Sequence, residues 1–177
     1  MMALRPGRCY RKVHRPYTRQ SSRRPRKGYI KGVPKPKISS FEMGKKGDYD
    51  KVLYLISKRN VQIRHNALES SRIGVVQTME KNIGKGATFF FKIRVYPHHV
   101  LRENALATGA GADRYQQGMK QSFGKPISTA AQVSAGQKLM EVRVNEANVK
   151  LAKKALKQAN YKLPTPCSIT IEDMKKQ

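Results

Sequence analysis

The chain has 177 residues, of which 38% are hydrophobic, and it carries a formal net charge of +26. This length accommodates one ordinary domain with an extension, or two very small domains. No apolar run reaches the length of a membrane span, and the N-terminus lacks the apolar stretch of a secretory signal. We therefore expect neither a membrane-spanning nor a secreted protein.

The positive charge is concentrated at the N-terminus. Residues 1–41 contain thirteen Lys or Arg and no Asp or Glu, so half of the net charge lies in under a quarter of the chain. Because like charges repel in a compact state, a polyanion is expected to complete this segment. Interleaved Pro, Gly and Tyr favour irregular contact with nucleic acid over a basic membrane-surface helix. A solvated disordered tail is the alternative that composition leaves open.

Targeting signals offer two other interpretations of the N-terminus. Residues 5–24 share the Arg-rich, Ser-rich and acid-poor bias of mitochondrial transit peptides, but they contain prolines and lack an apolar helical stripe. Residues 23–27 match a nuclear-import signal as well as they match a phosphate-binding run. We expect residues 1–40 to be a basic RNA-binding extension and residues 41–177 a single domain.

The first regular elements of this domain follow residue 60. Alternation over 61–64 indicates a strand, and an apolar stripe at helical spacing predicts a helix over 67–83. Asn66 followed by Glu69 has the spacing of a capping box, and Gly84 is a natural helix end.

Residues 87–96 carry the strongest strand signal, with two different faces. Phe89, Phe91, Ile93 and Val95 alternate with Phe90, Lys92, Arg94 and Tyr96. We expect the first set to be core. The second set, basic and aromatic, is either an RNA-contacting face or an ordinary exposed one. A further strand is expected over 98–102.

Residues 138–144 alternate again and predict a strand. Asn145 is a candidate cap for a second helix, whose apolar stripe runs from Val149 to Ala159 and whose lysines point elsewhere. Ile169 and Ile171 indicate a last strand. This order predicts the α+β class: a mixed, mainly antiparallel sheet with two helices packed on one side.

Between about Glu103 and Ser134 there is almost no apolar periodicity, and we expect a long flexible loop over residues 104–126. Loops of this length are uncommon in compact domains and are usually functional or disordered. Its glycines allow close backbone approach, and its Arg, Lys, Gln and aromatic side chains suit phosphates and bases. Neither a Walker loop nor a dinucleotide-binding turn matches it, because the required glycine and hydroxyl positions differ.

No catalytic or metal-binding constellation is evident. Cys9 and Cys167 lie at opposite ends of the chain and have no second ligand at metal spacing, so we expect inert thiols in a reducing cytosolic compartment. His98 and His99 would point to opposite faces of a strand, which is poor geometry for a shared metal. Asp113 has no neighbouring acid with which to form an acid–base pair. We expect no enzyme activity, cofactor or metal.

A resemblance covers nearly the whole chain. It is carried by RPGRCYR at 5–11, GVP at 32–34, RVYPHHVLR at 94–102, GADR at 111–114, GMK at 118–120 and FGKP at 123–126. Together these motifs resemble the archaeal and eukaryotic branch, often called "ten-e", of the universal large-subunit ribosomal protein family whose bacterial member is numbered sixteen. The short C-terminus is similar to archaeal members of that branch. In the loop, Lys120 stands where the family usually has Arg, which keeps the charge but loses the bidentate fork.

The resemblance implies a hammerhead-like two-layer domain and a structural constituent of the large ribosomal subunit, located in the cytoplasm. It implies binding to large-subunit rRNA and a loop that reaches tRNA near the peptidyl-transferase centre, without catalysis by the chain itself. Neighbouring large-subunit proteins are the other expected partners; no membrane and no homo-oligomer are expected. A free-standing RNA-binding assembly factor is the alternative. An RNA-modifying enzyme is a third class, disfavoured by the missing chemistry.

The candidate site residues fall into two groups. The RNA-binding candidates are Arg5, Arg8, Tyr10, Arg11, Lys12, Arg15, Tyr17, Arg19, Arg23, Arg24, Arg26, Lys27, Lys92 and Arg94. The candidates in the loop near tRNA and the peptidyl-transferase centre are Arg114, Gln116, Gln117, Lys120, Phe123 and Lys125.

Overall fold

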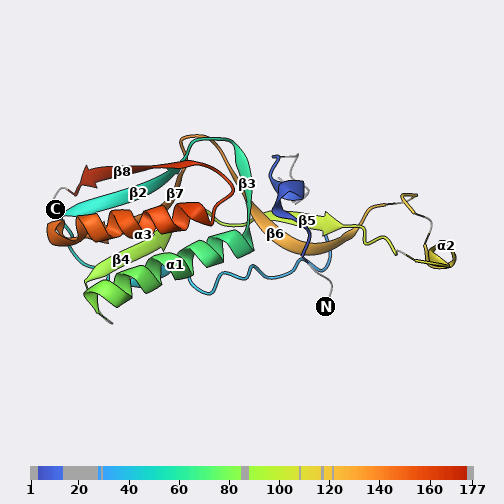
Figure 1. The fold of residues 1–177 in the computed structure, drawn as a ribbon, viewed down its shortest axis with the longest axis horizontal. Helices are drawn as coiled ribbons and strands as arrows, with labels where there is room; N and C mark the ends of the chain where they lie inside the picture. The colour runs from blue at the N-terminus through green and yellow to red at the C-terminus, as the bar shows by residue number, and fades with distance from the viewer. Residues whose placement is uncertain are drawn as a thin grey trace.

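The computed structural model describes residues 4–13, 28, 30–84, 88–107, 109–116, 118–120 and 122–174. A two-layer body of five strands and two helices occupies one end, and a β-hairpin projects from it (Figure 1). The strands are β1 (Glu42–Gly44), β2 (Lys51–Ser57), β3 (Val61–Arg64), β4 (Phe89–Ile93), β5 (His99–Glu103), β6 (Lys125–Val133), β7 (Lys138–Val144) and β8 (Cys167–Asp173). The helices are α1 (His65–Ile83), α2 (Ala112–Tyr115) and α3 (Val149–Tyr161), with 3-10 turns η1 (Gly7–Tyr10) and η2 (Glu146–Asn148).

The five-stranded sheet has the order β1-β4-β7-β2-β8, and every pair in it is antiparallel. Helices α1 and α3 cover one face of it (Figure 1). Alternate strand residues point into this layer, so Leu53, Phe91 and Val142 have no exposed surface. The predicted α+β class, with two helices on one side of a mainly antiparallel sheet, is confirmed. The strands divide between two sheets, however, rather than forming the single sheet expected.

Helix α1 ends as predicted but begins differently. Gly84 follows its last turn with φ 101°, and the Gly84 amide donates to the Glu80 carbonyl. The predicted capping box is wrong: Arg64 precedes the helix and no side chain caps it. Strand β3 runs straight into the helix, which leaves Asn66 inside it. Glu69 instead accepts hydrogen bonds from the amide and hydroxyl of Ser39 and pairs with Arg72.

Helix α3 starts later than predicted, whereas α1 starts earlier. Asn145 precedes the 3-10 turn η2, and no side chain caps either element. The strand predicted over 138–144 is confirmed as β7, and Met140, Val142 and Val144 are fully buried on one face, but Leu139 and Glu141 on the other face are buried as well. The last strand, β8, pairs with β2 and forms the edge of the sheet.

The sheet face opposite the helices, here called the open face, is only partly as predicted. Phe89, Phe91 and Ile93 are core residues, but the expectation that Phe90 is exposed is wrong. The Arg143 guanidinium covers the Phe90 ring at 5.1 Å from its centroid. An acid at the centre of the open face, Glu141, is fully buried and pairs with both Arg94 and Arg143.

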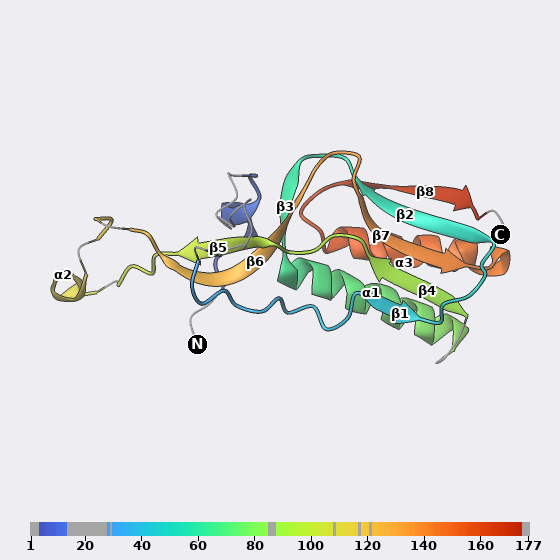
Figure 2. The same ribbon diagram turned by 180° about the vertical axis from the view of Figure 1, so that it is seen from behind.

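The second sheet builds the projecting hairpin. Its order is β3-β6-β5, and β5 and β6 are the two arms (Figure 2). Strand β6 corrects the sequence analysis, in which residues 125–126 belonged to the loop and the region up to Ser134 lacked periodicity. The strand is buried through small side chains, Ser128 to Ala131, rather than through large apolar ones, which is why no apolar alternation marks it.

Candidate nucleic-acid interface

The N-terminal segment, residues 4–13, is docked on the second sheet. The Gln62 amide donates to the Arg11 carbonyl, and the Gln62 side-chain amide donates to the Tyr10 carbonyl, each at 3.0 Å. The Gln62 side chain is itself fixed by Gln132 across the β3–β6 pair. The segment is therefore attached mainly through its backbone, which leaves its basic side chains outside.

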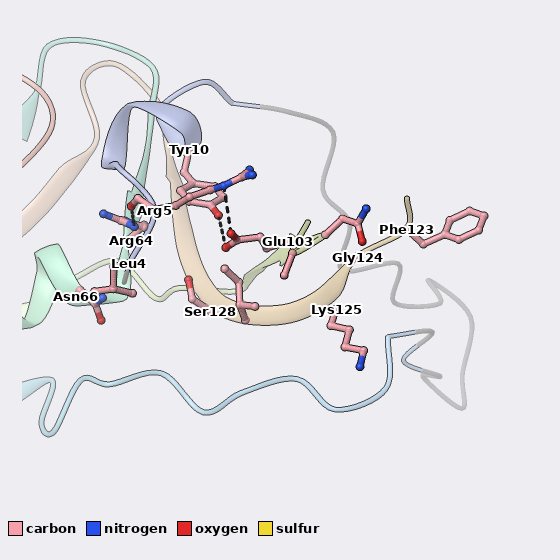
Figure 3. Close-up of a pocket in the computed structure, with 13 residues that line it drawn as sticks. Leu4, Arg5, Tyr10, Arg64, Asn66, Glu103, Phe123, Gly124, Lys125 and Ser128 are labelled. Carbon is pink, nitrogen blue, oxygen red and sulfur yellow. Dashed lines mark hydrogen bonds and ion pairs between the residues drawn. The ribbon is translucent and has the colours of Figure 1, made fainter. Parts of the chain in front are cut away.

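Glu103, at the end of β5, holds the N-terminal segment against the hairpin. Its carboxylate pairs with the Arg5 Nε at 3.2 Å and accepts a hydrogen bond from the Tyr10 hydroxyl at 3.3 Å (Figure 3). Burial and the negative charge of Glu103 raise the pKa of Tyr10, so the phenol remains a donor. Arg64 donates to the Arg5 carbonyl at 2.9 Å and lies against the Tyr10 ring.

A groove of about 660 Å³ lies between this segment and strands β5 and β6 of the hairpin (Figure 3). Leu4, Tyr10 and Ile127 give it apolar walls. Arg64 and Lys125 add positive charge, while Glu103, the only acid among the described residues of its lining, is already paired with Arg5. Apolar walls with cations at the rim suit a planar group that carries a negative charge, such as a nucleotide.

The predicted basic residues of the N-terminal segment face outward where they are described. Arg8, Arg11 and Lys12 are exposed, and none of them forms an ion pair with another described residue. Arg5 is half exposed and bound to Glu103. The remaining predicted residues of the extension lie outside the described residues: Arg15, Tyr17, Arg19, Arg23, Arg24, Arg26 and Lys27.

The structure does not bring Lys92 and Arg94 together with this segment. Both lie on the open face of the five-stranded sheet, where Lys92 pairs with Glu42 at 2.6 Å and Arg94 pairs with Glu141. Hydrogen bonds from Lys46 and Lys92 lower the pKa of Glu42 to about 2, so this carboxylate stays charged. These cations balance acids of the protein itself.

The far end of the hairpin presents its side chains to solvent. Tyr115 is 86% exposed, Phe123 is 74% exposed, and Arg114, Lys120 and Lys125 are exposed as well. Phe123 also belongs to the lining of the groove (Figure 3). Apolar exposure of this kind stabilises nothing in the isolated chain, so it indicates a contact surface.

Two residues shape the hairpin internally. The Gln116 side chain accepts from the Ala107 amide at 2.8 Å and donates to the Ala105 carbonyl, so it ties the loop to itself rather than facing a ligand. Gly124 has φ 69°, and a Cβ there would lie 2.9 Å from the Glu103 carbonyl carbon. Gln117 lies outside the described residues.

Sequence reasoning missed the residues that organise the interface. Gln62, Arg64 and Glu103 hold the N-terminal segment, and Glu141 fixes the open face. A sequence signal existed for Glu103 alone. It is the one acid between Glu80 and Asp113, and an acid in a basic region often pairs with a cation.

One thiol and one histidine, Cys167 and His65, have surroundings typical of structural residues. Burial raises the pKa of Cys167 to about 11, which makes this thiol unreactive, whereas Cys9 is exposed in η1. His65 is buried, and its Nδ1 lies 3.0 Å from the Thr129 hydroxyl. In the described part of the chain, no three His, Cys, Asp or Glu side chains gather as a metal site. No helix among the described residues is both long and apolar enough to cross a membrane.

The sequence matches known proteins over almost its full length. The sequence model of the family described as ribosomal protein L16p/L10e matches residues 17–170. A protein of Staphylothermus marinus named large ribosomal subunit protein uL16 is 50% identical over 176 residues, covering 98% of this chain and 97% of the relative. Proteins of the same name from Hyperthermus butylicus and Metallosphaera sedula are each 46% identical, and each alignment covers 99% of this chain and at least 97% of the relative. The family resemblance is confirmed: the chain belongs to the ribosomal protein L16p/L10e family.

Proposed function

We propose that the chain is a structural constituent of the large ribosomal subunit, as its family membership and the name of its archaeal relatives indicate. In this role the N-terminal segment and the groove beside it bind large-subunit rRNA. The tip of the hairpin reaches tRNA near the peptidyl-transferase centre. The chain positions RNA and performs no chemistry of its own.

The observation that carries the rRNA proposal is the docking of the N-terminal segment. Its backbone is fixed by Gln62 while Arg8, Arg11 and Lys12 stay exposed. Phosphates are bound by exposed cations whose positions are fixed by the fold, because less conformational entropy is then lost on binding. The segment therefore presents a preorganised row of positive charge.

The hairpin supports the tRNA proposal by its shape and its chemistry. It extends away from the two-layer body (Figure 1), so its tip can reach a ligand that the body does not touch. Tyr115 and Phe123 offer rings for stacking, and Arg114 and Lys120 offer charge. The division of the chain into extension and body fits these two roles. The extension anchors the protein on rRNA, and the body positions the hairpin.

Salt dependence tests the rRNA proposal. The triple variant Arg8→Gln, Arg11→Gln, Lys12→Gln should bind an rRNA fragment with a log–log salt slope shallower by about 2, since each single-strand phosphate contact contributes about 0.7. A matched variant with Lys45, Lys46 and Lys58 changed to Gln loses the same charge elsewhere and should keep the slope. Equal slopes for both variants would show that the segment makes no phosphate contacts.

The two cysteines provide a second test within one molecule. A small alkylating reagent should label Cys9 in the free protein, and rRNA should protect it, because Cys9 lies in the docked segment. Cys167 should label slowly in both states, since burial raises its pKa. Unchanged labelling of Cys9 in the complex would contradict the proposal.

Arg114→Ala and Lys125→Ala test the hairpin. Both side chains are exposed, so the melting temperature should not change, whereas tRNA binding by subunits carrying the variants should weaken. Lys45→Ala serves as the control. Loss of the fold in either variant would mean that the hairpin is a structural element instead.

A further inference from the structure

We propose that α3 carries a second RNA-binding surface, which holds the phosphate backbone of double-stranded RNA on the helical side of the body. This lysine face consists of Lys150, Lys153, Lys154 and Lys157. The identity of the partner as RNA rests on the proposed function. The location of the surface does not, because it lies on a different element from the N-terminal segment and the hairpin.

The spacing places these lysines in one row. Positions i, i+3, i+4 and i+7 fall on the same side of a helix, and the row from Lys150 to Lys157 is about 10 Å long at 1.5 Å per residue. The opposite side of α3, with Ala152, Leu156 and Ala159, is fully buried against the sheet and α1. The lysines are exposed, and Tyr161, 73% exposed, continues the row at its end.

The lysine face has no internal compensation among the described residues. Helix α3 contains no Asp or Glu, and none of its four lysines forms an ion pair with a described residue. Glu146 precedes the helix but lies near Lys51, whose pKa is raised chiefly by its hydrogen bond to Asp173 and to a lesser degree by Glu146. This differs from the open face, where Lys92, Arg94 and Arg143 are each bound to an acid.

Helix α1 extends the same surface across a shallow groove of about 310 Å³ between the helices. The lining contains Lys81 and Lys154 together with the amides Gln77, Asn82 and Gln158, and no acid among the residues that the structure describes. Thr78 donates to the Gln158 side chain, which holds this amide in the groove. Lysines flanked by amides are a combination that binds phosphate and ribose oxygens.

The composition of the surface favours nucleic acid over a protein or a membrane. Protein interfaces are depleted of Lys at their centres and enriched in Arg and aromatic residues, and here the exposed cations are all Lys. Membrane-surface helices insert their apolar side, but that side of α3 is core. Lysine chains are point charges on flexible stems, which suits phosphates along a duplex rather than a single fixed carboxylate.

Two RNA-binding surfaces at different ends have a structural consequence. The N-terminal segment docks beside the hairpin, whereas the lysine face lies on the two-layer body (Figure 1). A protein with this arrangement can hold two RNA segments at once. The chain would then act as a bridge within folded RNA.

Lysine acetylation footprinting of the full chain, with and without a double-stranded RNA hairpin, tests the proposal residue by residue. We expect RNA to protect Lys150, Lys153 and Lys157 several-fold, and to leave Lys45 and Lys58 unprotected. Protection of Lys12 without protection of α3 would overturn this inference and leave the proposed function standing. Protection of none of these lysines would overturn both.

A variant experiment gives an independent readout. Lys150→Gln, Lys153→Gln, Lys157→Gln should reduce the log–log salt slope of hairpin binding by about 2 to 3, since each phosphate contact on a duplex contributes about 0.9. The same three lysines changed to Arg should bind like the original chain, and both variants should show the original circular dichroism. An unchanged slope would contradict the proposal. So would variants that bind the polyanion polyglutamate more weakly but bind RNA as the original chain does.

Discussion

The two-layer body and the hairpin of this chain are stabilised in different ways. The body buries large side chains from both layers, such as Phe91, Leu156 and Met79, and pairs the charges of its open face internally. The outer part of the hairpin, between Glu103 and Ser128, exposes Tyr115, Met119 and Phe123. It is shaped by backbone turns instead. The body is thus stabilised by its own contacts, while the hairpin has a surface that only a partner can cover.

Core truncation should give the largest effect. Phe91→Ala removes a fully buried ring and should lower the free energy of unfolding by about 3–5 kcal/mol. Tyr115→Ala in the hairpin should change it by less than about 0.5 kcal/mol. Urea denaturation measures both, and similar losses in the two variants would remove the distinction between body and hairpin.

The buried acid of the open face should come next. Glu141→Gln keeps the shape but replaces charge-assisted hydrogen bonds to Arg94 and Arg143, so we expect a loss of about 2 kcal/mol. Glu172→Gln, at an exposed ion pair, is the control and should cost less than about 1 kcal/mol. If Glu141→Gln leaves the free energy of unfolding unchanged, the buried carboxylate is not what orders this face.

The end of the β5–β6 ladder away from the body, where Glu103 pairs with Lys125, offers a test within the hairpin. Gly124→Ala places a Cβ against the Glu103 carbonyl in a left-handed backbone conformation, with an expected cost of about 1–3 kcal/mol. Gly136→Ala also has positive φ but meets no neighbouring atom, so it separates backbone strain from the close contact. Hydrogen exchange should show the loss confined to β5 and β6. Exchange that increases throughout the body would contradict this.

The smallest expected effect is a pH dependence at the point where the second sheet joins α1. Burial, followed by the charges of Lys37 and Arg64, lowers the pKa of His65, so the folded state holds the neutral ring. The resulting stability is complete above the unfolded pKa of about 6.5 and is lost as pH falls through the folded value, at no more than about 1.4 kcal/mol per pH unit. A His65→Asn variant should lack this component below pH 6.5. If the variant and the original chain show the same pH profile, His65 titrates normally.

The parts that could be predicted from sequence are those with a local period. Period-two alternation predicted β4 and β7, and the apolar stripes predicted α1 and α3. Strand β6 was missed because it is buried through small side chains, and Phe90 was misplaced because Arg143, 53 residues away, covers it. The contacts of Tyr10 with Glu103 and with Gln62 join residues 93 and 52 positions apart, so no local pattern could indicate them. The N-terminal contact surface expected from the charge stays a prediction. Charge alone could not distinguish cations that face outward from those, such as Lys92, that pair with the protein's own acids.

Sedimentation of cell extracts tests the central claim most directly. The chain should remain with the large ribosomal subunit after a wash in moderately high salt, and the Arg8, Arg11, Lys12→Gln variant should be released at lower salt than the Lys45, Lys46, Lys58→Gln control. A free-standing assembly factor would leave the subunit in the same wash. Finding the original chain mainly in the free pool would contradict its assignment as a structural constituent of the subunit.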